Sequence, residues 1–161
     1  MWSVGDGALV KLYPEYCYRV WVPNSAEMLL LWCFAGLVLM VIYPGEWPWF
    51  AFSGMLSTIL ANVSHDCYRH LYRDADRCKD MDTNVTGVYW VGAVIESSLV
   101  RMISKIGRVR GILARKEFCL LGKRFDWFNG HWGNGPLKEE MKNGRERFYF
   151  SVMILLLSVL I

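Results

Sequence analysis

Two histidines and two cysteines lie within fourteen residues of one another: His65, Cys67, His70 and Cys78. Imidazole and thiolate groups are the ligands that zinc and haem iron take from proteins. The spacing does not suit such a site, because it contains neither a Cys-x-x-Cys nor a His-x3-His pair, and on a helix His65 and Cys67 would lie about 200° apart. We therefore predict no metal site and no cofactor.

Acidic residues in unusual positions are the next candidates for chemistry. Glu96 lies inside an apolar run. In a membrane-spanning helix such a carboxylate would be a candidate functional group, but in an amphipathic helix it would lie at the membrane interface. Glu139 and Glu140 are adjacent, so their side chains point in different directions and fit a solvated turn. The sequence also lacks a phosphate-binding loop, Gly-x-Ser-x-Gly, His-Glu-x-x-His and a dinucleotide fingerprint. We predict no catalytic residues and no enzymatic activity.

A basic and aromatic stretch is the strongest candidate for binding. Twelve of the eighteen Lys and Arg residues fall between Arg101 and Arg147, although the net charge is only +3. We predict a surface of six cations and three aromatic rings that docks onto a partner: Arg108, Arg110, Arg115, Lys116, Lys123, Arg124, Trp127, Phe128 and Trp132. The alternative is that these cations only retain the region on the cytoplasmic side of a membrane.

Two uncharged apolar runs lie close together in the first half of the chain. Met28–Tyr43 and Trp49–Val63 contain no charged residue and are separated only by residues 44–48. Each run is slightly shorter than the roughly 20 residues that span a bilayer, but Trp and Tyr at their ends fit the headgroup level. Residues 25–64 therefore predict a transmembrane helical hairpin. A buried helical pair in a soluble core is the alternative.

The residues before the hairpin contain two prolines, Pro14 and Pro23, and several aromatic side chains. We expect residues 1–24 to form an extended or interfacial lead-in without a cleavable signal. Asn24 followed three residues later by Glu27 is a capping-box pattern, which predicts the start of the first hairpin helix.

A basic cytoplasmic region, 65–147, and a hydrophobic C-terminal segment, 148–161, follow the hairpin. We expect the second hairpin helix to continue into the charged residues 65–82. Residues 87–106 begin apolar and then carry charges, which predicts an amphipathic helix at the membrane or on a partner, with a third spanning helix as the alternative. Residues 118–121 are a candidate strand. The predicted fold class is an all-α membrane protein: a transmembrane hairpin, an amphipathic cytoplasmic helix and a C-terminal hydrophobic helix.

The distribution of Lys and Arg predicts the orientation of the hairpin. Placing the N-terminus and residues 64–147 in the cytoplasm puts every cation inside and leaves only the turn at residues 44–48 outside. We therefore expect an integral protein of an inner or plasma membrane, with reduced thiols at its five cysteines. Asn62 and Asn84 match the glycosylation sequon, but in this orientation both lie near or in the cytoplasm.

The segment Leu121–His131 resembles the membrane-proximal part of TraD-like coupling proteins of conjugative plasmids and integrative elements. The shared features, in order, are Leu121-Gly122-Lys123, Phe125, Trp127 and His131. The segment upstream is also similar, with an Arg-x3-Pro-x3-Glu lead-in at Arg19, Pro23 and Glu27. The family's ATPase has no counterpart, because the chain has no phosphate loop and a third apolar segment follows instead. The resemblance implies a membrane anchor or another small inner-membrane component of a conjugation or type IV secretion machine.

These expectations lead to one function and two alternatives. We expect a non-enzymatic component of a larger membrane assembly, an anchor or docking subunit, and the resemblance implies that the assembly is conjugative DNA-transfer machinery. Its partners would be other membrane-complex subunits and the lipid bilayer, with no direct small-molecule substrate and only indirect contact with nucleic acid. The alternatives are a structural accessory subunit of an energy-converting membrane complex, and a viral or eukaryotic membrane glycoprotein modified at Asn62 and Asn84.

Overall fold

The computed structural model describes residues 2–43, 45, 47–75, 87–126 and 136–160. Most of these residues are helical, which confirms the predicted all-α class, although two three-residue strands are also present. The helices and strands, in chain order, are α1 (Trp2–Leu12), β1 (Cys17–Arg19), α2 (Ser25–Ile42), α3 (Trp47–Tyr68), α5 (Gly87–Ala114), β2 (Lys123–Phe125) and α6 (Pro136–Leu160). Short 3-10 helices precede the two strands, at Pro14–Tyr16 and Phe118–Leu120.

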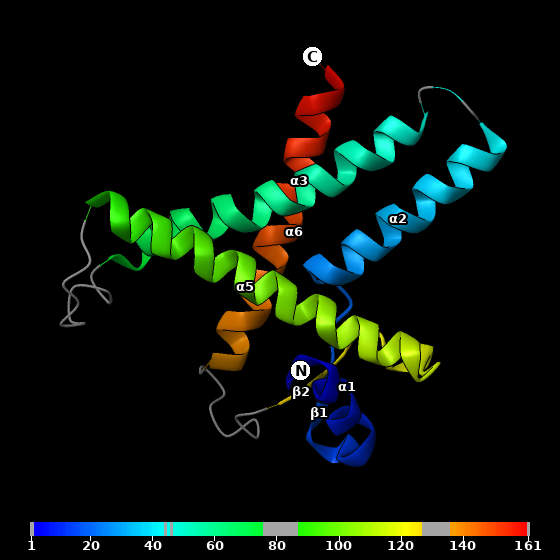
Figure 1. Ribbon diagram of the computed structural model, residues 1–161. Coiled ribbons are helices and arrows are strands. Elements are labelled where there is room, and N and C mark those ends of the chain that lie inside the picture. The colour runs from blue at the N-terminus through cyan, green and yellow to red at the C-terminus, as the bar shows by residue number, and fades with distance from the viewer. Residues whose placement is uncertain (1, 44, 46, 76–86, 127–135, 161) are drawn as a thin grey trace.

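α2 and α3 pack along each other with opposite chain directions (Figure 1). The predicted capping box is confirmed: the Asn24 side chain accepts a hydrogen bond of 2.9 Å from the Glu27 N–H, and the Glu27 carboxylate accepts one of 3.0 Å from the Asn24 N–H. Between the helices, Gly54 lies against the ring of Trp32 so closely that a Cβ at this position would overlap it. Gly45, in the connecting turn, has a φ of +138°, which glycine adopts without a steric penalty.

α6 packs against α3, and it is one continuous helix. The predicted division at residue 148 falls inside this helix, because the change from basic to apolar residues occurs without a proline to end it. The contact is partly polar: the hydroxyls of Thr58 and Ser151 lie 3.4 Å apart, and the ring centroids of His65 and Phe150 are 5.8 Å apart, with their planes perpendicular.

The second hairpin helix continues beyond Ser64, as predicted. α3 ends at Tyr68, and the chain then forms a π-helical turn, Arg69–Arg73. A π turn holds one more residue per hydrogen-bonded ring than an α-helix, so it changes which side chains face the neighbouring helix. Residues 76–82, the rest of the expected continuation, lie outside the described residues.

The N-terminal residues are mostly helical rather than extended, which corrects the expected lead-in. α1 packs against α5 around a small core formed by Val10, Ile112 and Leu120. Apolar contact with a distant segment stabilises this helix, and residues 1–24 alone give no sign of that segment.

β1 and β2 form an antiparallel pair that joins the lead-in to the segment after α5. The register places Cys17 opposite Phe125, Tyr18 opposite Arg124 and Arg19 opposite Lys123. The strand predicted at residues 118–121 is therefore wrong by a few positions: the apolar residues there form a 3-10 helix, and the strand follows Gly122, whose φ is +78°.

Large apolar side chains cover the surface of α2 outside its contact with α3. Six of them are more than half exposed: Leu31, Phe34, Leu37, Met40, Val41 and Ile42. Within the part of the chain that the structure describes, α2 is the helix that is long and apolar enough to cross a membrane by length and composition. α3 and α6 also expose apolar side chains, among them Phe52, Leu56, Leu60, Met153, Leu156 and Leu157.

Three cations of α5 face the rest of the molecule, and several of its apolar side chains are exposed while others are buried. Arg101, Lys105 and Arg108 share one face at i, i+4 and i+7, and this face turns toward the rest of the molecule. On the opposite face, Val100 and Ile103 are 59% and 66% exposed. The helix begins at Gly87 as predicted but runs eight residues beyond the expected end, to Ala114. The uncovered apolar face fits the predicted position at a membrane or on a partner.

Candidate functional site

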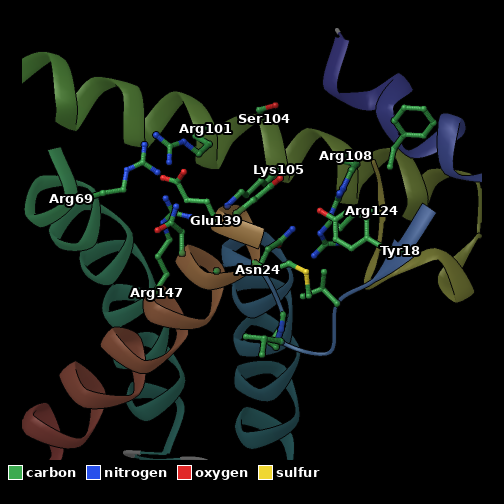
Figure 2. A pocket seen from close by; sticks show the side chains of 18 residues that line it. Tyr18, Asn24, Arg69, Arg101, Ser104, Lys105, Arg108, Arg124, Glu139 and Arg147 are labelled. Atoms are coloured by element: carbon green, nitrogen blue, oxygen red, sulfur yellow. The ribbon is translucent and has the colours of Figure 1, made fainter. Parts of the chain in front are cut away.

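An open cavity of about 620 Å³ lies among the chain before α2, the middle of α5 and the first half of α6 (Figure 2). Six cations line it: Arg69, Arg101, Lys105, Arg108, Arg124 and Arg147. Two carboxylates, Glu139 and Glu140, belong to the wall, and three more, Glu27, Asp66 and Asp74, pair with wall cations from behind. Among the described residues, the positive charges therefore exceed the negative charges by one.

One end of the cavity is built on Glu27, which forms what we call the Glu27 cluster with Arg108 and Arg124. Arg124 donates two hydrogen bonds to the Glu27 carboxylate, at 2.9 and 2.7 Å, and Arg108 Nη2 lies 3.7 Å from Glu27 Oε1. The Gly122 N–H adds a third hydrogen bond, at 3.1 Å. All three charged residues are at least nine-tenths buried. The cluster therefore fixes the start of α2 to α5 and β2 in one geometry.

The other end is built on Asp66, which forms what we call the Asp66 cluster with His65, Arg101 and Arg147. Asp66 is 1% exposed, and its Oδ1 accepts hydrogen bonds from Arg147 Nη2 at 2.6 Å and Arg101 Nη1 at 3.3 Å. Burial opposes ionisation of Asp66, but the imidazole of His65 and the guanidinium groups of Arg147 and Arg101 outweigh it and hold the pKa well below its usual range. Asp66 therefore stays ionised and unites three helices.

A second carboxylate extends the Asp66 cluster along α6. Glu146 Oε2 lies 2.8 Å from His65 Nε2 and accepts a 2.7 Å hydrogen bond from Arg73 Nη1. Arg73 also donates a 2.8 Å hydrogen bond to the side-chain oxygen of Asn143. The π-helical turn brings Arg73 into this position, so that the end of α3 is held against α6.

Lys105 lies between the two clusters and has no carboxylate of its own (Figure 2). Its ammonium forms no hydrogen bond and no ion pair within 4 Å to any residue in the described part of the chain. Burial, together with the positive charges of Arg147 and Arg101, lowers the pKa of Lys105 to about 7, and Glu140 and Asp66 offset only part of this shift. The centre of the cavity is therefore a positive site without a fixed counter-charge.

The structure separates the six cations of the predicted docking surface into three groups. Arg108 and Arg124 are buried in the Glu27 cluster, which corrects their placement on an exposed surface: a carboxylate 97 positions from Arg124 in sequence binds both of them. Arg110, Arg115 and Lys116 are exposed at the end of α5, where Arg115 donates a 2.8 Å hydrogen bond to Glu117. Lys123 is half-buried in β2.

The three predicted aromatic members, Trp127, Phe128 and Trp132, lie outside the described residues. Among the residues that are described, no three His, Cys, Asp or Glu side chains are grouped so that they could hold a metal ion. Glu96, the carboxylate considered for a membrane role, is exposed on α5.

Sequence reasoning missed Arg101, Lys105, Arg147 and Asp66 as members of a site. The i, i+4, i+7 spacing of Arg101, Lys105 and Arg108 was a usable signal, because it places three cations on one helical face. No local signal joins Asp66 to Arg147, since 81 positions separate them.

Asn62 is buried, which argues against its use as a glycosylation acceptor. Its side-chain nitrogen donates a 2.8 Å hydrogen bond to the Thr58 carbonyl within α3. Asn84 lies outside the described residues. Comparisons with protein-family models, with curated proteins and with solved structures found no match to this chain.

Proposed function

We propose that this protein is a non-enzymatic integral membrane subunit, in which α2, residues 47–64 of α3 and the second half of α6 form the anchor and α5 lies at the interface. The observation that carries the proposal is the exposed apolar surface of α2, and the exposed side chains of Val100 and Ile103 on α5 support it. In water, a row of exposed side chains such as Leu37 and Val41, 64% and 82% exposed, would be costly. In lipid the same surface is solvated.

Two native thiols test the anchor directly. Cys33 lies on α2 and Cys119 on the 3-10 helix before β2, and both are exposed on the protein surface. Maleimides react with the thiolate, which forms in water and not in hydrocarbon. We expect a permeant maleimide to label a Cys119-only variant in native membranes, and to label a Cys33-only variant only after denaturation in sodium dodecyl sulfate. Equal labelling of the two variants in native membranes would overturn the anchor.

The distribution of cations supports an orientation with the N-terminus and residues 64–147 in the cytoplasm, at an inner or plasma membrane. The same labelling assigns the side of the membrane when an impermeant maleimide is used. In intact cells we expect Cys119 to be protected, and in inverted vesicles we expect it to react.

We further propose that the exposed cations at the end of α5 dock this anchor onto other subunits of a membrane assembly. Arg110 and Lys116 carry the proposal, because the structure leaves both exposed. Conjugative DNA-transfer machinery is the assembly we propose, on the sequence resemblance at Leu121–His131. The double variant Arg110→Glu/Lys116→Glu is expected to lose the native high-mass complex, while Arg145→Glu, an exposed cation on α6, is expected to retain it. Retention of the complex by both variants would rule out docking through this surface.

A further inference from the structure

We propose that the cavity between the Glu27 cluster and the Asp66 cluster binds a phosphate-bearing anion, with Lys105, Arg101 and Arg147 as its principal ligands. The proposal is independent of the docking surface at the end of α5. It rests on three observations: the charge left over in the wall, the polar groups without partners, and the position of the cavity relative to the apolar surface.

The charge in this part of the cavity is not balanced by the protein. Asp66 is shared by Arg101 and Arg147, so that one carboxylate serves two guanidinium groups, and Lys105 adds a third positive charge beside them. Glu140 also lies in the wall, yet no carboxylate in the described residues reaches Lys105. A phosphate group carries one to two negative charges near neutral pH, which is enough to balance this surplus.

The hydrogen-bonding capacity is also incompletely used. Arg147 Nε is buried and has no partner within the described residues, while its Nη2 bonds to Asp66. Lys105 contributes three further N–H donors without acceptors. Tyr18, on the opposite wall, keeps its hydroxyl proton, because burial and the nearby Glu140 raise its pKa to about 12. These are donors from three separate elements, and phosphate oxygens accept from such donors.

The pKa of Lys105 is shifted downward, which is the direction expected of a cation in an anion-binding site without its anion. Burial and the neighbouring Arg147 and Arg101 disfavour its charged form, and Glu140 and Asp66 only partly oppose them. A phosphate oxygen beside the ammonium would favour the charged form and raise the pKa again.

The surroundings of the cavity suit a ligand larger than inorganic phosphate. A volume of about 620 Å³ is several times that of one phosphate group, and its wall includes the apolar side chains Val20, Val22 and Met141. Val22 is close in sequence to Ser25, where the apolar helix α2 begins. An acidic phospholipid would place its phosphate at the cations and its glycerol along these apolar side chains. The shared chemistry is a phosphate anion, and its source is either a lipid headgroup or free phosphate.

The test measures stabilisation of the full-length protein, purified in a neutral detergent, by three probes at equal ionic strength: short-chain phosphatidic acid, short-chain phosphatidylcholine and inorganic phosphate. Lys105→Met removes the unmatched charge without breaking an ion pair, so this variant is expected to fold. Arg110→Met, on the exposed face of the same helix, is the matched control.

We expect phosphatidic acid to raise the thermal unfolding midpoint of the wild-type protein and of Arg110→Met, with an apparent Kd at least tenfold weaker in Lys105→Met. Stabilisation by phosphatidic acid alone assigns a lipid headgroup, and stabilisation by inorganic phosphate as well assigns free phosphate as a sufficient ligand. Equal responses in wild type and Lys105→Met, or no response to any phosphate probe, would overturn the site. Binding of inorganic phosphate needs no bilayer. The outcome of this test therefore does not depend on whether Cys33 is shielded by lipid in the labelling experiment.

Discussion

Arg124 and Glu27 form a two-point ion pair, at 2.9 and 2.7 Å, between the strand β2 and the first turn of α2. The same carboxylate completes the capping box with Asn24. Glu27 thus performs a local task, which the sequence pattern predicts, and a long-range task, which it does not. The predictions below separate these tasks and then address the packing and ionisation of the other sites.

Replacing Glu27 with Leu is expected to destabilise the protein by about 3–5 kcal/mol, because Arg124 would remain buried without its carboxylate. The double variant Glu27→Leu/Arg124→Leu is expected to recover only part of this loss, because Arg108, which also pairs with Glu27, would still lack that carboxylate. Chemical unfolding in detergent measures both values. Glu96→Gln, an exposed carboxylate on α5, is the control and should change stability by less than about 0.5 kcal/mol. If Glu27→Leu lowered the stability by no more than this control, the Arg124–Glu27 pair would not have the importance that we assign to it.

Adding a methyl group at Gly54 is expected to destabilise the α2–α3 contact by about 1–3 kcal/mol, because the new Cβ would overlap the Trp32 ring. The control is Gly92→Ala on α5, where a Cβ has no atom within 4 Å. That change should stabilise the helix by up to about 1 kcal/mol, since alanine is the better helix former. The midpoint of thermal unfolding should fall when alanine replaces Gly54 and rise in Gly92→Ala. A shift in the same direction for both variants would be inconsistent with the close approach of α2 and α3.

Asp66→Asn is expected to cost about 3–5 kcal/mol near neutral pH, because the buried guanidinium group of Arg147 and the partly exposed one of Arg101 would lose the anion that they share. The pKa of Asp66 is lowered in the folded state, so its contribution is complete above the ordinary aspartate pKa of about 3.9 and is lost as the pH falls below it. The wild-type protein should therefore lose stability below about pH 4 more steeply than the Asp66→Asn variant. Identical acid slopes for the two proteins would exclude this role for the Asp66 cluster.

Lys105 is expected to make the ligand-free protein more stable as the pH rises from about 7 to about 8.5. Its folded pKa of about 7 lies below the ordinary value of 10.5, so at this site the unfolded chain binds more protons than the folded chain in this window. The measurement stops at about pH 8.5, the ordinary pKa of a cysteine thiol, because the raised pKa values of Cys17 and Cys67 act in the opposite direction above that point. Lys105→Met should remove this increase of stability with pH, and Arg110→Met should retain it. A slope unchanged in Lys105→Met would assign it to another group.

Local patterns in the sequence predicted several features correctly. Asn24 and Glu27 lie three residues apart, and the cap they form depends on nothing else in the chain. The start of α5 at Gly87 and the turn at Gly45 follow in the same way from apolar runs and a glycine that tolerates positive φ. These interactions all join residues within one turn or one helix.

The features that the sequence did not predict join residues far apart in the chain. α1 is stabilised by Ile112 and Leu120, which nothing in residues 1–24 anticipates. Arg108 and Arg124 looked like free surface charges because the carboxylate that binds them lies on another helix. A cation's neighbours in sequence therefore gave no information about whether it was paired, and for that reason the predicted docking surface included two buried cations.

The pairing of β1 with β2 has a consequence for how the protein is made. β1 leaves the ribosome before α2, α3 and α5, and its partner Lys123–Phe125 follows only after them. At roughly 5–20 residues per second, synthesis of the intervening stretch takes on the order of 10 s. During this interval β1 has no strand to pair with, and Glu27 has no Arg124. β1 is therefore synthesised well before the segment that provides its native contacts.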